Sequence, residues 1–513
     1  MNPTLQQALA KGLPRRQFLQ NLLLSAGSVS TASWLTACSS PSGKSGSVPG
    51  VPAQFDSKFA SMGPLLAANS DGIALPEGFT SRVLATFAQP VQLDDGSSSG
   101  FAWHSDPDGG GTFRTDDGGW IYLSNSEARD FTTFGASREQ VEQGNAIPAL
   151  LGGALSDVPG LGDALSGPLD QGFFRGGCSC LRFNAAGELV DAYAVQRKTT
   201  TNCSGGATPW GTWLNGEEIA DGLAFECSPL RDGGNDLSNP RHIPHFGRKG
   251  HEMFAVDEAG RAIYHTEDVG GNDRFYRTIY SNAAWPAGGR PDYEQGVLQV
   301  LRVPAGLSAA QAGPTPIEWI NAPDNDQPQS SQYPEASTAI PGNEGVWCFG
   351  DFIFLSNKGD PTVENENNIW AIDTIANTIE SIFDVSDNDP VGSFVDPTEP
   401  VMTGVDNIAM TDDGEMLVVE DGGFMRVMVL LPDRRTIPLM RLPHLGDPAS
   451  HPSPSEVTGV ALGPTGDKIY VSAQRSLANG FVTPPLAGGI TYEITMPFKV
   501  NVTRPLAQPL PPV

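Results

Sequence analysis

Positive charge is scarce in this sequence, which has 31 lysines and arginines against 59 aspartates and glutamates and a formal net charge of −28. Binding to the phosphates of DNA or RNA needs a basic surface, so nucleic acid is excluded as an expected partner. Clustered carboxylates repel one another unless they are protonated, solvated or neutralised by metal ions. For most of the acidic residues, solubility alone is a sufficient role.

Long apolar runs are also nearly absent. The one candidate, from Phe18 to Ala37, is short and broken by serines, which argues against a permanent membrane span. No second run of that length follows, so we expect a soluble body.

The N-terminus is typical of an export signal. Residues 14–19, PRRQFL, resemble a twin-arginine signal, and residues 35–38, LTAC, resemble a lipobox that ends in Cys38. We therefore expect a signal peptide at 1–37 and a lipidated Cys38 as the only membrane contact of a periplasmic or cell-surface lipoprotein. The alternative is ordinary signal cleavage near Cys38. Residues 38–53 are rich in Ser, Gly and Pro and predict a flexible tether.

Cysteine is rare, and no CxxC pair is present among the 6 cysteines. A zinc site built from cysteine and histidine is therefore poorly supported, because His242, His245 and His251 lack a partnering cysteine pair. Lipidation of Cys38 leaves an odd number of thiols, so at least one is free or forms an intermolecular bridge. We assign Cys203 as the unpaired thiol and leave the pairing of the others open.

A repeated pattern indicates the fold. Several segments consist of an alternating apolar run, a turn with glycine and a second alternating run, which is typical of β-hairpins. The six turn glycines are Gly118, Gly187, Gly260, Gly350, Gly414 and Gly466. Units of this kind along one chain predict an all-β fold, a single six-bladed β-propeller over residues 54–513. A pair of β-sandwiches is the structural alternative. Residues 131–172 break the pattern and predict a helical or loop insertion.

The segment Thr201–Glu218, TNCSGGATPWGTWLNGEE, combines residues that core packing alone does not require. Cys203 offers a soft thiolate, and Glu217 and Glu218 offer hard oxygen ligands. The glycine pair 205–206 is interpreted as letting the backbone approach a bound ion. The alternative is a buried structural cysteine beside a solvated acidic turn.

Further acidic residues fall at the ends of the expected hairpins. In a propeller these ends face one shared channel mouth, so acids that are far apart in sequence can meet there. The acids in question are Glu127, Glu217, Glu218, Glu252, Asp268, Glu344, Asp406, Glu420 and Glu456. The alternative is that strand ends are exposed and often acidic for no further reason.

The Cys203 segment also resembles the signature of the PhoX-type alkaline phosphatase family, with Gly216 where that family often has a second cysteine. Other segments match the family in order along the chain: GRKGHE (247–252), HTED (265–268), GNEG (342–345), VDN (405–407), VVEDGG (418–423) and SEVTG (455–459). The resemblance implies a propeller fold and a mixed iron and calcium centre. Carried over, it assigns Cys203 and Glu252 to iron. It assigns to iron or calcium Glu218, Glu344, Asp406, Glu420 and Glu456.

Three basic side chains are candidates for catalytic binding of phosphate. Arg248 and His251 lie in the loop before Glu252, and Arg475 follows the last hairpin. Each has an alternative role as an ordinary surface cation. The family pattern has a phosphate-binding arginine two residues before the glutamate of the E-G step, whereas this sequence has Gly342 there.

These observations predict a metal-dependent hydrolase of small-molecule phosphate esters, expected as a monomer. Two alternatives stay open at this point. One is another calcium-dependent propeller hydrolase, lactonase-like or phytase-like, against which the thiolate of Cys203 argues. The other is a non-catalytic surface propeller that metal ions only stabilise.

Overall fold

The computed structural model describes residues 57–128, 176–358, 367–384, 401–432, 434–443, 455–475 and 489–511. The expected signal peptide, the tether with Cys38 and the insertion at 131–172 lie outside these residues. Within the described ranges, no helix has both the length and the apolar character needed to cross a membrane.

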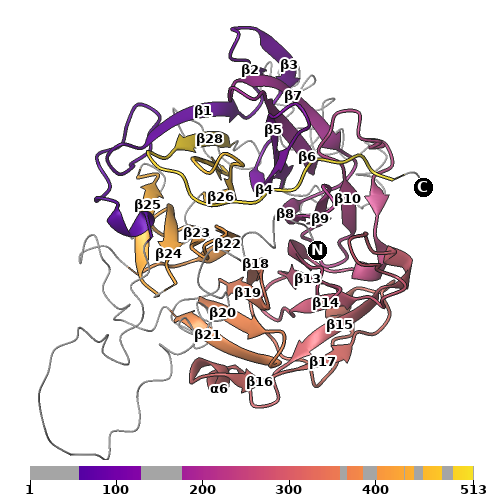
Figure 1. The fold of residues 1–513 in the computed structure, drawn as a ribbon. Coiled ribbons are helices and arrows are strands. Elements are labelled where there is room, and N and C mark those ends of the chain that lie inside the picture. The colour runs from indigo at the N-terminus through magenta and orange to yellow at the C-terminus, as the bar shows by residue number, and fades with distance from the viewer. Residues whose placement is uncertain are drawn as a thin grey trace, which may run out of the picture.

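The chain forms a six-bladed β-propeller, as expected from the hairpin pattern. Each blade is an antiparallel sheet that begins with an inner strand, and the blades form a ring around a central axis (Figure 1). The inner strands are β4 (Pro107–Arg114), β8 (Asn202–Ala207), β12 (His251–Asp257), β18 (Asn343–Phe349), β22 (Val405–Met410) and β26 (Val457–Leu462). The second strands are β5 (Trp120–Ser126), β9 (Trp213–Glu217), β13 (Ala262–Glu267), β19 (Phe352–Asn357), β23 (Met416–Glu420) and β27 (Lys468–Ala473).

The outer half of each blade follows the same order. The third strands are β6 (Gly177–Phe183), β10 (Ala224–Cys227), β14 (Tyr276–Ile279), β20 (Asn368–Asp373), β24 (Arg426–Leu430) and β28 (Ile490–Thr495). The fourth strands are β7 (Leu189–Gln196), β11 (Arg241–His242), β15 (Val297–Arg302), β21 (Thr378–Asp384), β25 (Thr436–Arg441) and β1 (Thr80–Thr86). Two blades gain a fifth strand, β17 (Glu318–Asn321) on β15 and β16 (Thr315–Pro316) on β21.

Short elements connect the blades. A hairpin of β2 (Pro90–Gln92) and β3 (Ser98–Ala102) projects from the rim. The described helices are all one to two turns long: η1 (Phe59–Ser61), η3 (Pro244–Phe246), η4 (Tyr293–Gln295), α6 (Leu307–Gln311) and η5 (Gln329–Ser331).

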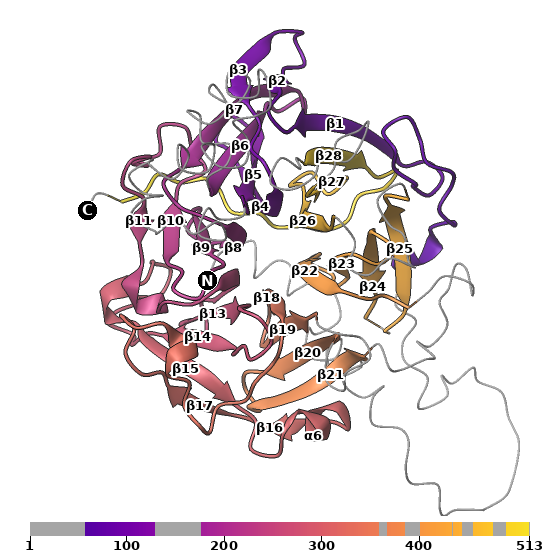
Figure 2. The same ribbon diagram turned by 180° about the vertical axis from the view of Figure 1, so that it is seen from behind.

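The two ends of the propeller domain close the ring together. Strand β1 pairs with β28 from Thr80↔Thr495 to Thr86↔Ile490, so the N-terminal strand completes the blade formed by the last three strands. Figure 2 shows β1 and β28 side by side, as Figure 1 does from the other face. This pairing leaves no open sheet edge between the first and last blades.

The core lies between neighbouring blades. The central strands read as almost continuous apolar runs, such as MLVVE in β23, because both faces of each blade are covered. One large cluster joins the blades of β12, β18 and β22 and includes Phe354 and Trp370, and a second joins the blades of β22 and β26.

The hairpin count predicted six blades for a partly wrong reason. The turns at Gly118 and Gly187 belong to one blade, since β4–β5 and β6–β7 lie in the same sheet. The blade of β8 to β11 was not counted, because its inner hairpin turns at Gly211 within the Cys203 segment. One extra hairpin and one missed blade compensated for each other.

The glycines beside Cys203 serve strand packing. A Cβ at Gly206 would lie 2.0 Å from the carbonyl oxygen of Phe254 on β12, and one at Gly205 would lie 2.4 Å from the carbonyl oxygen of Leu214. Glycine is needed here because the backbones of adjacent strands approach closely. This corrects the interpretation that these glycines make room for an ion.

The C-terminal segment runs along the end of the propeller where the inner hairpins turn. Its backbone pairs with Gly466 through Val500, with Asp412 through Asn501 and with Gly211 through Gln508. The starts of the inner strands lie at the opposite end, which leaves that end for the site described next.

Candidate metal centre

All six inner strands begin with a β-bulge. The pairing of each inner strand with its second strand shifts register within its first few residues. A bulge adds an unpaired residue and redirects the neighbouring side chain. The same local irregularity therefore acts at the same end of every blade.

A ring of ligand-type side chains sits at these bulges. We call it the first ring: in five blades its member is the second residue of the inner strand, and in the sixth it directly precedes β26. The first ring consists of Asp108, Cys203, Glu252, Glu344, Asp406 and Glu456. All six residues are buried.

A second ring surrounds the first. Its members are the residues that directly follow the second strand of each blade: Glu127, Glu218, Asp268, Lys358, Asp421 and Gln474. Four of them are half-buried, whereas the first ring is fully buried. The centre is therefore reached from solvent past the second ring.

The two rings produce three groups that could hold a metal ion. In each group the candidate ligand atoms lie within 4.8 Å of one another. The groups are Asp108–Glu127–Cys203, Cys203–Glu218–Glu252 and Asp406–Asp421–Glu456. Cys203 belongs to two of them, so its thiol lies where two ligand groups meet.

The buried oxygens fit a cation. Both carboxylate oxygens of Glu252 and Oδ1 of Asp108 are buried without a hydrogen-bond partner among the described residues. A buried carboxylate without partners is costly, and a bound metal ion compensates for that cost. The donor set combines one thiolate, which suits a transition metal, with several carboxylates, which suit harder ions.

Without a bound cation, burial and neighbouring acids raise the pKa values of several ring residues. Burial, followed by the charge of Glu218, raises the pKa of Glu252 well above its usual value. Burial and then Asp108 raise the pKa of the Cys203 thiol. Burial and then Asp421 raise the pKa of Glu456 to about 7, although Arg475 acts in the opposite direction. A metal ion would reverse these shifts, since it favours the deprotonated ligand.

Lys358 is the one cationic member of the second ring. Its Nζ lies 2.9 Å from Oε1 of Glu344, 3.1 Å from Oδ2 of Asp421 and 3.7 Å from Oδ2 of Asp268. Burial lowers the pKa of this ammonium group, but Glu344 and the other acids outweigh burial and the pKa is raised. Lys358 is therefore charged at neutral pH.

Arg475 contacts the opposite side of the centre. Its guanidinium lies 2.7 Å from Oε1 of Glu456 and 3.6 Å from Oε2 of Glu127, with Asp106 at 3.8 Å. Beside it, Gln474 donates a hydrogen bond of 2.6 Å to Asp108. The structure thus brings Arg475, expected from the sequence as a phosphate-binding residue, to the rings.

Glu420 lies outside both rings, which corrects its place in the expected ligand set. Both of its carboxylate oxygens are bound by the buried guanidinium of Arg426, at 2.6 and 2.8 Å. Successive residues of a strand point to opposite faces, so the last residue of β23 points away from the centre while Asp421 points toward it. Glu217 shows the same geometry, since it accepts hydrogen bonds from the backbone of Thr200 and Leu223.

The structure does not bring Arg248 and His251 to the rings. Arg248 forms its ion pair with Asp221, 2.9 Å away and outside the rings. His251 is fully buried, shares a hydrogen bond of 3.1 Å with the carbonyl of Gly247 and stacks on Phe254. Its neighbour Glu252 points toward the centre, so His251 faces the other side of β12.

Four members of the rings, Asp108, Lys358, Asp421 and Gln474, are not among the residues expected from the sequence. Asp108 lies in a PDGG segment whose glycines resemble those of the Cys203 segment, and that similarity was the available signal. Asp421 follows Glu420 directly, and the acidic pattern of this segment fits either residue. Lys358 and Gln474 are neither acids nor thiols, so a pattern of metal-ligand residues does not point to them.

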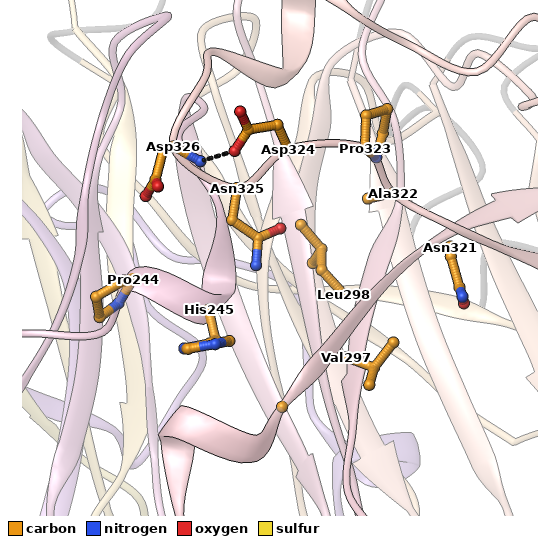
Figure 3. Close-up of a pocket in the computed structure, with 11 residues that line it drawn as sticks. Pro244, His245, Val297, Leu298, Asn321, Ala322, Pro323, Asp324, Asn325 and Asp326 are labelled. Atoms are coloured by element: carbon orange, nitrogen blue, oxygen red, sulfur yellow. Dashed lines mark hydrogen bonds between the residues drawn. The ribbon is translucent and has the colours of Figure 1, made fainter.

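A surface cavity lies on the rim of the propeller, away from the two rings. It is a cavity of about 430 Å³ beside β15 and β17, lined by residues that include His245, Leu298 and Asn325. In Figure 3, the backbone N–H of Asp326 donates a hydrogen bond of 2.9 Å to Asp324. None of its lining residues belongs to either ring.

The fold and the rings define a β-propeller with an acidic, thiol-containing centre at one end of its axis. A family model described as alkaline phosphatase PhoX matches residues 60–236, which include the Cys203 segment. No curated protein matches.

Two solved structures are similar to this chain. PhoX from Pseudomonas fluorescens, solved in complex with vanadate, a transition state analogue, is similar at TM-score 0.56 and 16% identity, over 86% of this chain and 98% of that one. A luciferin-regenerating enzyme is similar at TM-score 0.39 and 10% identity, over 84% of this chain and 100% of its own. The PhoX structure supports the propeller fold, and the match of the family model supports the class of phosphoric ester hydrolases.

Proposed function

We propose that this protein is a metal-dependent phosphatase that hydrolyses small-molecule phosphate esters at the two rings. The observation that carries the proposal is the meeting of Cys203 with the buried carboxylate of Glu252, which has no hydrogen-bond partner among the described residues, inside a ring of further acids. The match of the PhoX family model over 60–236 supports the reaction class.

The ligand groups suggest how two kinds of metal would be held. Cys203, Glu218 and Glu252 combine a thiolate with carboxylates, which suits iron. Asp406, Asp421 and Glu456 offer only oxygen, which suits calcium. Asp421 replaces Glu420 in the proposed set, because Glu420 is bound to Arg426.

Bound metal would supply a water of lowered pKa and positive charge at the phosphate oxygens. The chain's own contribution is orientation and exclusion of water. Arg475 is held in place by Glu456 and has further N–H donors for a phosphate oxygen. The buried first ring keeps the reacting end of the substrate out of bulk solvent, which strengthens every charge interaction there.

We also propose that the protein is an exported lipoprotein of the periplasm or cell surface. The PRRQFL signal at residues 14–19 and the lipobox ending at Cys38 support export by the twin-arginine route followed by lipid anchoring. Folding before export would allow the metals to be taken up in the cytoplasm. A monomer with no nucleic-acid partner remains our expectation.

One experiment tests the proposed function. The metal content of the purified protein would be measured by mass spectrometry, and its activity on p-nitrophenyl phosphate, bis-p-nitrophenyl phosphate and a lactone would be compared. We expect bound iron and calcium and hydrolysis of a phosphate ester. Hydrolysis of the lactone alone, or metal-bound protein inactive on all three, would contradict the proposal.

A further inference from the structure

Lys358 occupies a position that other blades give to an acid. The residue after the second strand is Glu127, Glu218, Asp268 and Asp421 in four of the blades, and it is Lys358 after β19. Because the blades repeat one geometry, these positions direct side chains to the same centre. The ammonium group of Lys358 therefore lies at a position whose equivalents in other blades belong to the candidate metal groups.

The surroundings of Nζ are those of a bound cation. Glu344 and Asp421 approach within 2.9 and 3.1 Å and Asp268 within 3.7 Å, so three blades direct oxygens at one nitrogen. Among the described residues, Glu344 and Asp268 belong to none of the three candidate metal groups. Their carboxylates are instead neutralised by the lysine.

The backbone holds this lysine in place. The N–H of Lys358 donates a hydrogen bond of 2.8 Å to the carbonyl of Gly342, whose own N–H donates to Asp273 at 2.9 Å. A Cβ at Gly342 would lie 3.2 Å from Cγ of Lys358, and φ of Gly342 is +59°, a conformation that favours glycine. Gly342 thus leaves the space that the stem of Lys358 fills.

We propose that the Lys358 ammonium group is a built-in cation of the centre, which takes the place of a divalent metal ion between Glu344, Asp268 and Asp421. This inference rests on the proposed metal centre. It implies that the chain neutralises one side of the rings itself and that the centre holds one metal ion fewer than its acids would otherwise admit. It also assigns Glu344 to the lysine and not to a metal.

The test is the number of metal ions per chain. Wild type, Lys358→Ala, Lys358→Arg and Lys468→Ala would be saturated with Ca²⁺, desalted and analysed by mass spectrometry. Lys468 is a matched control, since its ammonium lies 3.1 Å from Glu493 outside the rings. We expect Lys358→Ala to gain about one Ca²⁺ per chain over wild type, since it frees the carboxylates of Glu344 and Asp268 beside Asp421, and the other two variants to match wild type.

Different failures are distinguishable. Wild-type protein without metal would refute the proposed function itself. Metal-bound wild type with an unchanged count in Lys358→Ala would overturn only the role of Lys358, and a raised KM at that unchanged count would indicate phosphate binding instead. If Lys358→Ala does not fold, Glu344→Gln provides the test. Since Glu344 is assigned to Lys358, we expect this variant to keep the wild-type metal count. Loss of one ion from Glu344→Gln would overturn the role of Lys358.

Discussion

Cys203 and Glu252 occupy the same position, the second residue, of the neighbouring inner strands β8 and β12. The bulge at the start of each strand directs both side chains toward the propeller axis, where their ligand atoms lie within 4.8 Å together with Glu218. The local geometry of one hairpin, repeated around a ring, thus assembles a site from residues distant in sequence.

Replacing Cys203 tests the thiolate. Cys203→Ala should lose most of its iron and its phosphatase activity, because the remaining carboxylates prefer harder ions. Iron content and hydrolysis of p-nitrophenyl phosphate would be measured against Cys348→Ala, whose cysteine lies on β18 outside the rings. Iron at the wild-type level in Cys203→Ala would refute its role as a ligand.

The neighbours Glu420 and Asp421 should behave differently. Glu420→Gln removes the carboxylate that forms an ion pair with the buried guanidinium of Arg426, so we expect a loss of about 3–5 kcal/mol in the free energy of unfolding with the metal count unchanged. Asp421→Asn should lower the metal count with a smaller loss of stability. Denaturant unfolding and elemental analysis of both variants would check this. Loss of metal in Glu420→Gln with an unchanged metal count in Asp421→Asn would contradict the ring geometry.

Gly206 should be intolerant of a side chain. Gly206→Ala places a Cβ against the carbonyl of Phe254, so the strands must separate, and we expect a loss of about 1–3 kcal/mol in unfolding free energy. Gly63→Ala is the control, because nothing lies within 4 Å of the Cβ it would add. Equal stability of the two variants in denaturant unfolding would show that β8 and β12 do not approach so closely.

The metal-free protein should lose stability as the pH rises. The pKa of Glu456 is raised from 4.5 to about 7 by burial and Asp421, so its protonated form is the one the folded state favours. That contribution is complete below pH 4.5 and is lost as the pH rises through about 7. We expect the unfolding midpoint in chelator to fall on the order of a few °C over this range.

Added metal should reverse this trend, since a cation favours the charged carboxylates. The measurement is thermal unfolding from pH 5 to 8 in chelator and in Ca²⁺ with iron. A metal-free midpoint that rises with pH would mean that these acids are not held close together.

Lipid anchoring gives a prediction for the cell. Cys38→Ser should move the protein from the membrane fraction to the soluble fraction, because the lipid is the only membrane contact we expect. Fractionation followed by immunoblotting would check this. Continued membrane association of the variant would reject the anchor.

Alternation and turn glycines predicted the propeller, because strand period and turn chemistry are local properties. Acids at hairpin ends likewise predicted Glu252, Glu344, Asp406 and Glu456, and the segment 201–218 predicted Cys203. The structure places these five residues in one ring. The sequence could not choose between Glu420 and Asp421, because a strand boundary uncertain by one residue reverses the face to which a side chain points.

The same one-residue uncertainty explains why His251 was expected at the site. It directly precedes Glu252 and therefore faces the opposite side of the strand, where it stacks on Phe254. Lys358 escaped prediction for another reason. Its role depends on carboxylates from three blades, and only the closed ring brings them within reach of one ammonium group.

A crystal structure of the metal-bound protein with anomalous diffraction data collected at the iron edge tests the central claim most directly. We expect an iron peak bonded to Sγ of Cys203 and to the carboxylate of Glu252, at the ring end of the propeller axis. Iron bound only on the outer rim, or a fully active crystal with no peak at Cys203, would contradict it.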